Sequence, residues 1–126
     1  IPTSTGAAKA IGKAIPALEG KMEGYALRVP VNDGSIVDLV LELSKNVSVD
    51  DINKAFTSSQ NETLLATFDP LVSSDIIGNM HGSVVDCNLT KVISDSSNLI
   101  KVVGFYDNEL GYTAQMIRTA IYFMTK

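Results

Sequence analysis

The sequence predicts an α+β domain with a largely antiparallel or mixed sheet that is covered on one face by helices and ends in a C-terminal helix. Two observations predict this class. Apolar residues recur at helical spacing in three segments, and most of the chain between them consists of short segments typical of strands. These strands do not alternate strictly with the helices, so a doubly wound parallel sheet is not expected.

The first helix is predicted to run from about Thr5 and to be interrupted near Pro16. Ser4 or Thr5 stands where an N-cap residue is expected, with a hydroxyl that can accept from a free backbone N–H. Gly6 adds no side chain, so an anion can approach the amide groups of the first turn. A plain helix cap and an anion site are both open interpretations. The apolar residues on one face are Ala7, Ala8, Ile11, Ala14, Ile15 and Leu18.

Two strands are expected next. The first, Tyr25 to Val29, is short and stops at Pro30, and the turn that follows contains Asp33-Gly34, a pair that tolerates positive φ. The second has the clearest alternation in the sequence, so one of its faces is expected in the core and the other is mixed. The core-facing residues are Val37, Leu39, Leu41 and Leu43; the others are Ile36, Asp38, Val40, Glu42 and Ser44.

Ser48 is the expected cap of a second helix, because acidic residues follow it in the first turn. The segment from Ser73 to Met80 is ambiguous and is assigned as loop with some strand. The last helix is predicted to start after Asn108. The buried residues expected are Val49, Ile52, Ala55 and Phe56 in the second helix, and Met116, Ile117, Ala120, Ile121 and Met124 in the last. The remaining strands expected are Leu64–Phe68, Ser83–Asp86, Thr90–Ser94 and Leu99–Tyr106. In the last of these, Ile100 and Val102 are expected on one side and Leu99, Val103 and Phe105 on the other.

Composition narrows the classes of function. Hydrophobic residues make up 45% of the 126 residues and charged residues 19%, which is ordinary for one globular domain with a buried core. A net charge of −4 and a pI near 4.8 argue against a general nucleic-acid surface. We see no apolar run long enough to span a bilayer and no signal peptide. The single cysteine excludes an internal disulfide framework and suits a reducing compartment.

Two polar residues have both a structural and a binding interpretation. Arg28 can be solvated or paired with a carboxylate, as arginines on strands usually are. Alternatively, its guanidinium faces the helix start at Thr5 and Gly6, which would make a two-sided cradle for a phosphate group. Asn108 can cap the last helix, or its side-chain amide can bond the amide of a ligand. Spacing alone does not separate these alternatives.

The remaining reactive residues do not form a recognisable catalytic or metal site. His81 is the only histidine and has no second His or Cys at metal-ligand spacing, so we expect no metal. Cys87 precedes no evident helix that would lower its pKa, and we interpret it as a structural thiol. The chain has no Gly-rich dinucleotide fingerprint and no Walker-type loop.

Four separated motifs together resemble one family. They occur in order along essentially the whole chain, and their combination is specific where each alone is only suggestive. The similarity is to the C-terminal part of phosphorylating glyceraldehyde-3-phosphate dehydrogenase. The motifs are Ser4-Thr5-Gly6-Ala7-Ala8-Lys9-Ala10, Leu27-Arg28-Val29-Pro30, Val37-Asp38-Leu39 and Tyr106-Asp107-Asn108-Glu109 with Gly111-Tyr112.

This resemblance implies a cytoplasmic, glycolytic oxidoreductase, usually a homotetramer, that converts glyceraldehyde 3-phosphate, inorganic phosphate and NAD to 1,3-bisphosphoglycerate and NADH. It implies that Thr5, Gly6 and Arg28 contact phosphate. It also implies that Asn108 bonds the nicotinamide carboxamide, while Tyr112 matches an aromatic residue that lines the nicotinamide side.

The resemblance also implies that residues 1–126 are a partial catalytic domain. In that family the nucleophilic cysteine and its partner histidine lie upstream of the first motif, as does the Rossmann domain. Cys87 and His81 match neither catalytic position, so the chain alone is expected to be inactive, with poor NAD binding. Leu110 replaces the usual Trp or Phe after the Asn-Glu pair. The alternative is a non-enzymatic binding or interaction module derived from that domain.

Overall fold

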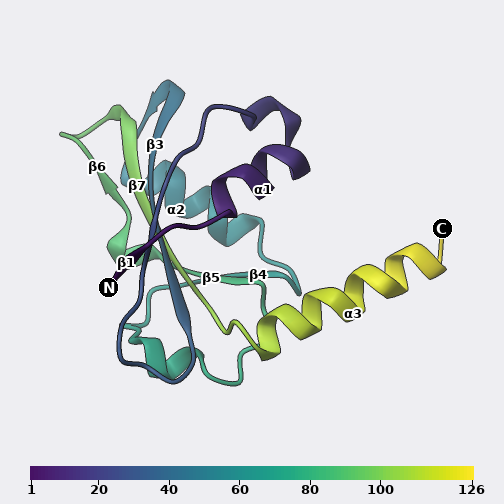
Figure 1. The fold of residues 1–126 in the computed structure, drawn as a ribbon. Coiled ribbons are helices and arrows are strands. Elements are labelled where there is room, and N and C mark those ends of the chain that lie inside the picture. Colours follow the sequence, from purple (N-terminus) through teal and green to yellow (C-terminus); the bar gives the residue numbers. More distant parts are fainter. The chain divides into compact units, whose positions relative to one another are not determined.

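A five-stranded mixed sheet forms the centre of the larger of two units in the chain (Figure 1). The computed structural model describes residues 1–126, with Ile1–Asn32 in one unit and Asp33–Lys126 in the other. Strand β4 pairs with β5 in parallel, and every other pair in the sheet is antiparallel. The sheet order is β3 (Ser35–Val47), β7 (Ser97–Tyr106), β5 (Ser83–Asp86) and β4 (Leu64–Thr67), with β6 (Lys91–Val92) also paired to β7.

The smaller unit contains the predicted first helix and the short strand that follows it. Helix α1 is shorter than predicted and covers Ala7–Ala14, because Pro16 cannot continue the helix and instead opens the 3₁₀ turn η1 (Pro16–Leu18). Strand β2 (Ala26–Leu27) pairs antiparallel with β1 (Pro2–Thr3), a strand that the sequence did not predict.

Strand β7 is the central element of the larger unit because both of its faces are buried. On one face, Ile100 and Val102 pack with Ile52 of helix α2 (Val49–Ser58). On the other face, Val103 and Phe105 belong to a separate cluster, which includes Ile76 of the 3₁₀ turn η2 (Ser73–Ile76). The predicted division of the β7 side chains between two faces is therefore confirmed, and part of the ambiguous segment 73–80 is this 3₁₀ turn.

The long strand β3 confirms the predicted alternation. Its register pairs Leu39 with Val102 and Leu41 with Ile100, so these leucines share the face on which α2 packs. The residues between them lie on the opposite face, where Val40 is exposed and Asp38 forms a 2.8 Å ion pair with Lys101. One face of the strand thus joins the core and the other is mixed.

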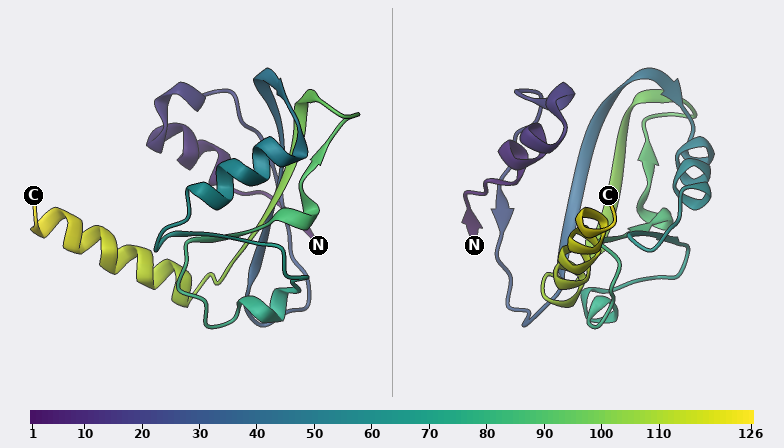
Figure 2. Two further views of the ribbon diagram at one scale, coloured as in Figure 1. Left: turned by 180° about the vertical axis from the view of Figure 1, so that it is seen from behind. Right: turned by 90° about the vertical axis from the view of Figure 1, so that its right-hand side faces the viewer.

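Helix α2 begins at the predicted cap. The Ser48 Oγ atom accepts from the Asp51 N–H at 3.2 Å, and the Asp51 carboxylate accepts from the Ser48 N–H at 2.9 Å. The backbone N–H of Ser48 is the main reason that the pKa of Asp51 is lowered. This reciprocal capping box satisfies two donors that the helix itself cannot bond. Figure 2 shows α2 lying along one side of the sheet.

The last helix is correctly placed, but its predicted burial is wrong. Helix α3 covers Leu110–Met124, and in Figures 1 and 2 it extends away from the sheet rather than lying on it. Gly111 is its only buried residue, because no other layer of the larger unit covers the apolar stripe. No helix combines the length and apolar content required to cross a lipid bilayer. The predicted core residues that are exposed instead are Met116, Ile117, Ala120, Ile121 and Met124.

We expect Ser48→Ala to lower the free energy of unfolding by about 1 kcal/mol, because it removes the side-chain cap of α2. Urea denaturation followed by circular dichroism measures this change. Ser59→Ala at the other end of the same helix is the matched control, since the Ser59 hydroxyl makes no hydrogen bond. Equal stability of the two variants would show that the capping box contributes nothing.

Candidate ligand-binding residues

The buried carboxylate of Asp107 organises the turn between β7 and α3. One oxygen, Oδ1, accepts from the N–H groups of Glu109 and Leu110 at 2.8 and 2.7 Å. The other, Oδ2, accepts from the N–H of Gly78 at 2.8 Å. Asp107 is only 1% exposed, so these bonds satisfy a buried charge as well as the first amides of the helix. Asp107, and not Asn108, therefore provides the side-chain cap at this end of α3.

The same hydrogen bonds determine the protonation of this carboxyl group. The Gly78 N–H is the largest cause that lowers the pKa of Asp107, and the N–H groups at the start of α3 lower it further against the opposing effect of burial. A lowered folded-state pKa means that the ionised form stabilises the fold. This contribution is present above the ordinary carboxyl pKa and is lost as the pH falls through the folded-state value.

The structure leaves the side chain of Asn108 available to a ligand. Its Oδ1 atom accepts from the Ser35 hydroxyl at 3.0 Å, and this bond joins residues 73 positions apart in the chain. Its Nδ2 group makes no hydrogen bond within the chain, and the residue is exposed. A primary amide has two N–H donors and two acceptor positions. Asn108 thus presents both donors and one free acceptor position to solvent.

The start of α3 is anchored close to Asn108. A Cβ atom at Gly111 would lie 3.0 Å from the carbonyl oxygen of His81, so only glycine permits this close approach without a shift. One and two turns later, the side chains of Gln115 and Arg118 donate to the carbonyl of Met80 at 2.9 and 2.8 Å. The base of α3 is therefore held against the loop before β5, while its later turns are free.

Tyr112 lies in the first turn of α3, and its side chain is 66% exposed. No hydrogen bond joins it to Asn108. The sequence placed both of them in one motif, and the structure gives only Asn108 a specific partner.

In the smaller unit, the amino terminus of α1 has unused amide groups. The Thr5 hydroxyl accepts from the N–H of Ala7 at 3.2 Å, whereas the N–H groups of Ala8 and Lys9 have no partner in the chain. The first turn contains no acidic residue that would balance the positive end of the helix dipole. A Cβ atom at Gly6 would meet nothing within 4 Å, so the space beside Gly6 is open.

Arg28 directly follows strand β2 and lies beside the segment that leads into α1. Its backbone exchanges hydrogen bonds with Ile1, at 2.7 and 2.9 Å, which extends the pairing of β1 with β2. Arg28 is thus displaced from Thr5 by four residues along the strand, at most about 13 Å at roughly 3.3 Å per residue. Its guanidinium is exposed and makes no ion pair or hydrogen bond.

Cys87 has the properties of a structural thiol. It is 3% exposed and belongs to the core cluster that contains Val85 and Val102. Burial, with a smaller contribution from the neighbouring Asp86, raises the pKa of the Cys87 thiol. Both effects disfavour the thiolate that a nucleophile requires. His81 instead pairs its ring nitrogen with the Asn79 side-chain oxygen at 2.9 Å.

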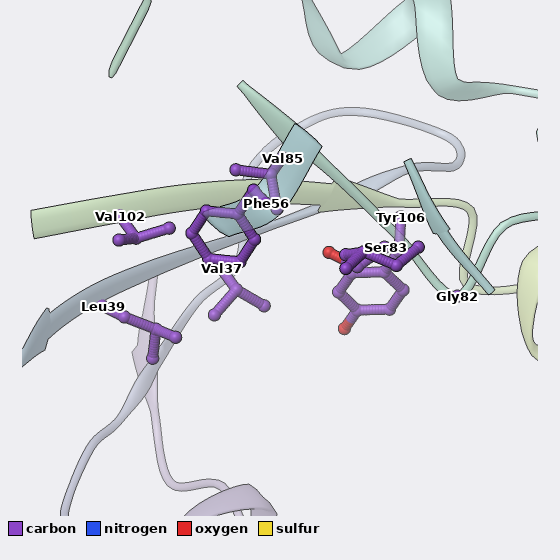
Figure 3. A pocket seen from close by; sticks show the side chains of 10 residues that line it. Val37, Leu39, Phe56, Gly82, Ser83, Val85, Val102 and Tyr106 are labelled. Carbon is purple, nitrogen blue, oxygen red and sulfur yellow. The ribbon is translucent and has the colours of Figure 1, made fainter. Parts of the chain in front are cut away.

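An apolar cavity of about 360 Å³ lies between α2 and the sheet (Figure 3). The Phe56 ring and the side chains of Val37, Val85 and Val102 border it, and Tyr106 lies at one end. None of the five residues predicted to bind ligands lines this cavity.

The fold and these residues define an α+β domain with two polar features, a helix amino terminus with free amides in one unit and an oriented asparagine amide in the other. The family model described as "Glyceraldehyde 3-phosphate dehydrogenase, C-terminal domain" matches residues 1–108. The chain belongs to this family.

Curated relatives agree with this assignment. A glyceraldehyde-3-phosphate dehydrogenase from Streptococcus pyogenes is 56% identical, one from Streptococcus dysgalactiae subsp. equisimilis is 55% identical, and one from Clostridium pasteurianum is 50% identical. Each match covers 98% of this chain and 37% of the relative. The chain therefore spans little more than a third of the length of these relatives.

Two of the residues that organise the candidate site were not among the sequence predictions. Asp107 could have been found as a capping residue, because Asp is favoured just before a helix. Ser35 carries no such signal, because its bond to Asn108 depends on the pairing of β3 with β7.

We expect Asp107→Asn to lower the melting temperature by several degrees at neutral pH, because the ionised carboxylate is lost from three backbone donors. The difference in melting temperature between the variant and the unsubstituted chain should shrink as the pH falls through the lowered folded-state pKa, where the native carboxyl also becomes protonated. Thermal unfolding from acidic to neutral pH tests this. Asp95→Asn, at an exposed carboxylate without a partner, is the control. An equal loss of melting temperature in this control would contradict a specific stabilising role of the Asp107 carboxylate.

Proposed function

We propose that residues 1–126 act as part of the catalytic domain of an NAD-dependent, phosphorylating glyceraldehyde-3-phosphate dehydrogenase. The observation that carries this proposal is 50–56% identity to curated dehydrogenases along 98% of the chain. The complete enzyme converts glyceraldehyde 3-phosphate, inorganic phosphate and NAD to 1,3-bisphosphoglycerate and NADH. The nucleophilic cysteine and the histidine base belong to another part of that enzyme, since Cys87 is buried as a thiol in a core cluster.

The proposed role of the smaller unit is phosphate recognition. Thr5 and Gly6 stand at a helix terminus where two N–H groups have no partner, a favourable environment for an oxyanion. Arg28 supplies an uncompensated positive charge in the same unit, and guanidinium groups bind phosphate in a bidentate manner. These properties support a cradle in which the phosphate joins the helix terminus to Arg28.

The proposed role of Asn108 is to orient the nicotinamide of NAD. NAD accepts a hydride when it is bound. The free Nδ2 donors and the remaining acceptor position of Asn108 fit the complementary groups of a carboxamide. Tyr112 is proposed to line the nicotinamide side, consistent with its exposed ring in the first turn of α3. Positioning of this kind promotes reaction because it holds the reacting groups in a productive orientation.

The partner proposed for the exposed apolar face of α3 is the rest of the same enzyme, which is a homotetramer when complete. Large apolar side chains are not normally left in one exposed stripe unless another surface covers them. The same observation favours the second candidate function, a non-enzymatic interaction module, because it requires only a partner. The side chains of this stripe are Met116, Ile117, Ile121 and Met124, and Tyr122 and Phe123 are exposed beside it.

The phosphate role is testable in a chimera in which this chain replaces the matching segment of the Streptococcus pyogenes dehydrogenase. We expect Arg28→Ala to raise the KM for inorganic phosphate or glyceraldehyde 3-phosphate by about tenfold or more, because a charged hydrogen-bond donor is lost. Steady-state kinetics measure this. Lys21→Ala, which removes an exposed cation from the same unit, should have little effect. Unchanged kinetics in Arg28→Ala would remove this residue from the site.

The isolated chain should form no NADH from glyceraldehyde 3-phosphate, NAD and phosphate, because its single cysteine is a buried thiol. A spectrophotometric assay at 340 nm, with the active chimera as control, measures this. The molar mass in solution is determined on the same sample. We expect the chain to associate through the exposed stripe of α3. NADH formation by the chain alone would overturn the proposal that the nucleophile belongs to another part of the enzyme.

A further inference from the structure

The side chain of Ser35 directs Asn108, although the two residues are far apart in sequence. Ser35 is the first residue of β3, and the strand register places it opposite Tyr106 of β7. Asn108 follows Tyr106 by two positions, so the β3–β7 pairing brings the Ser35 hydroxyl to 3.0 Å from the Asn108 Oδ1 atom. This contact depends on the sheet and not on local sequence.

The backbone on both sides of Asn108 is held independently. The Asp107 carboxylate bonds the N–H groups of Glu109 and Leu110, and its other oxygen bonds Gly78. The main chain at Asn108 thus has little freedom, and what remains variable is the rotation of its side chain. The Ser35 hydroxyl is the one group of the chain that bonds this side chain.

We propose that Ser35 is a positioning residue that sets the orientation of the Asn108 amide for the carboxamide of a nicotinamide nucleotide. The inference rests on the proposed cofactor role of Asn108. When Ser35 donates to Oδ1, the Nδ2 group is directed away from the strand and keeps both donors for the ligand. Without the hydroxyl, the amide can rotate or exchange the places of its oxygen and nitrogen, and binding must then order it.

A purely structural role for Ser35 makes a different prediction. In that case the bond only fastens the loop after β7 to the end of β3, and its loss would lower stability without changing cofactor affinity. Comparing Ser35→Thr with Ser35→Val separates the two roles, because threonine and valine have nearly the same shape and both suit a strand. Only threonine retains the hydroxyl.

The first measurement is made on the 126-residue chain by NMR of the Asn108 side-chain amide, assigned with Asn108→Ala. We expect Ser35→Thr to keep the native resonance positions and Ser35→Val to shift the two amide protons toward the values of a freely rotating side chain. Ser44→Ala, at an exposed serine of the same strand without a side-chain bond, is the control. A native spectrum in Ser35→Val would overturn the orientation.

The second measurement uses the chimera with the Streptococcus pyogenes enzyme. Ser35→Val should raise the KM for NAD roughly three- to tenfold, the effect of one neutral hydrogen bond, and leave the KM for phosphate unchanged. Ser35→Thr should leave the KM for NAD at the value of the unsubstituted chimera. In an Asn108→Ala background, Ser35→Val should have no further effect, because the two residues act through one contact.

The possible outcomes distinguish the positioning role of Ser35 from the cofactor role of Asn108, on which it rests. If Asn108→Ala raises the KM for NAD and Ser35→Val does not, then Asn108 binds the cofactor and the positioning role of Ser35 is wrong. If Asn108→Ala leaves the KM for NAD unchanged, the proposed cofactor role fails and the inference fails with it. If Ser35→Thr and Ser35→Val raise the KM for NAD equally, the hydroxyl is not the cause of the change and the positioning role is again wrong.

Discussion

The antiparallel pairing of β3 with β7 is the constraint on which the larger unit depends. It runs from Ser35 opposite Tyr106 to Glu42 opposite Leu99, and it places β7 where both of its faces are buried. Because side chains alternate along a strand, a shift of one residue would move the core-facing leucines of β3 to the opposite face of the sheet. The same shift would remove Ser35 from Asn108. The core and the candidate cofactor residue are therefore set by one register.

Asp107 holds the turn between β7 and α3, so its neighbour Asn108, a candidate binding residue, is not needed for that task. The carboxylate performs the capping function that was one interpretation of Asn108, and it satisfies three backbone donors in a buried position. Asn108 is left exposed, with its amide nitrogen free. This division of labour between adjacent residues gives the motif a physical meaning, since one residue holds the turn and the next is available to a ligand.

The two candidate binding regions differ in how completely the chain builds them. Asn108 has a defined partner and a constrained backbone, whereas Arg28 has an exposed guanidinium with no partner and is offset along its strand from Thr5. Helix α3 shows the same incompleteness on a larger scale, because its apolar side chains have nothing to pack against. Both features agree with the proposed function, and the chain spans 37% of the length of its relatives.

The sequence by itself determined which local elements form and which family the motifs resemble. The alternation in β3, the cap at Ser48 and the two faces of β7 follow from local periodicity and hydrogen bonding, and all three are present in the structure. Tertiary structure decided what periodicity cannot specify. Helical spacing shows which face of α3 would be buried but not whether another element covers it. The contact of Ser35 with Asn108 likewise arises only when two distant strands pair, because 73 residues separate its partners along the chain.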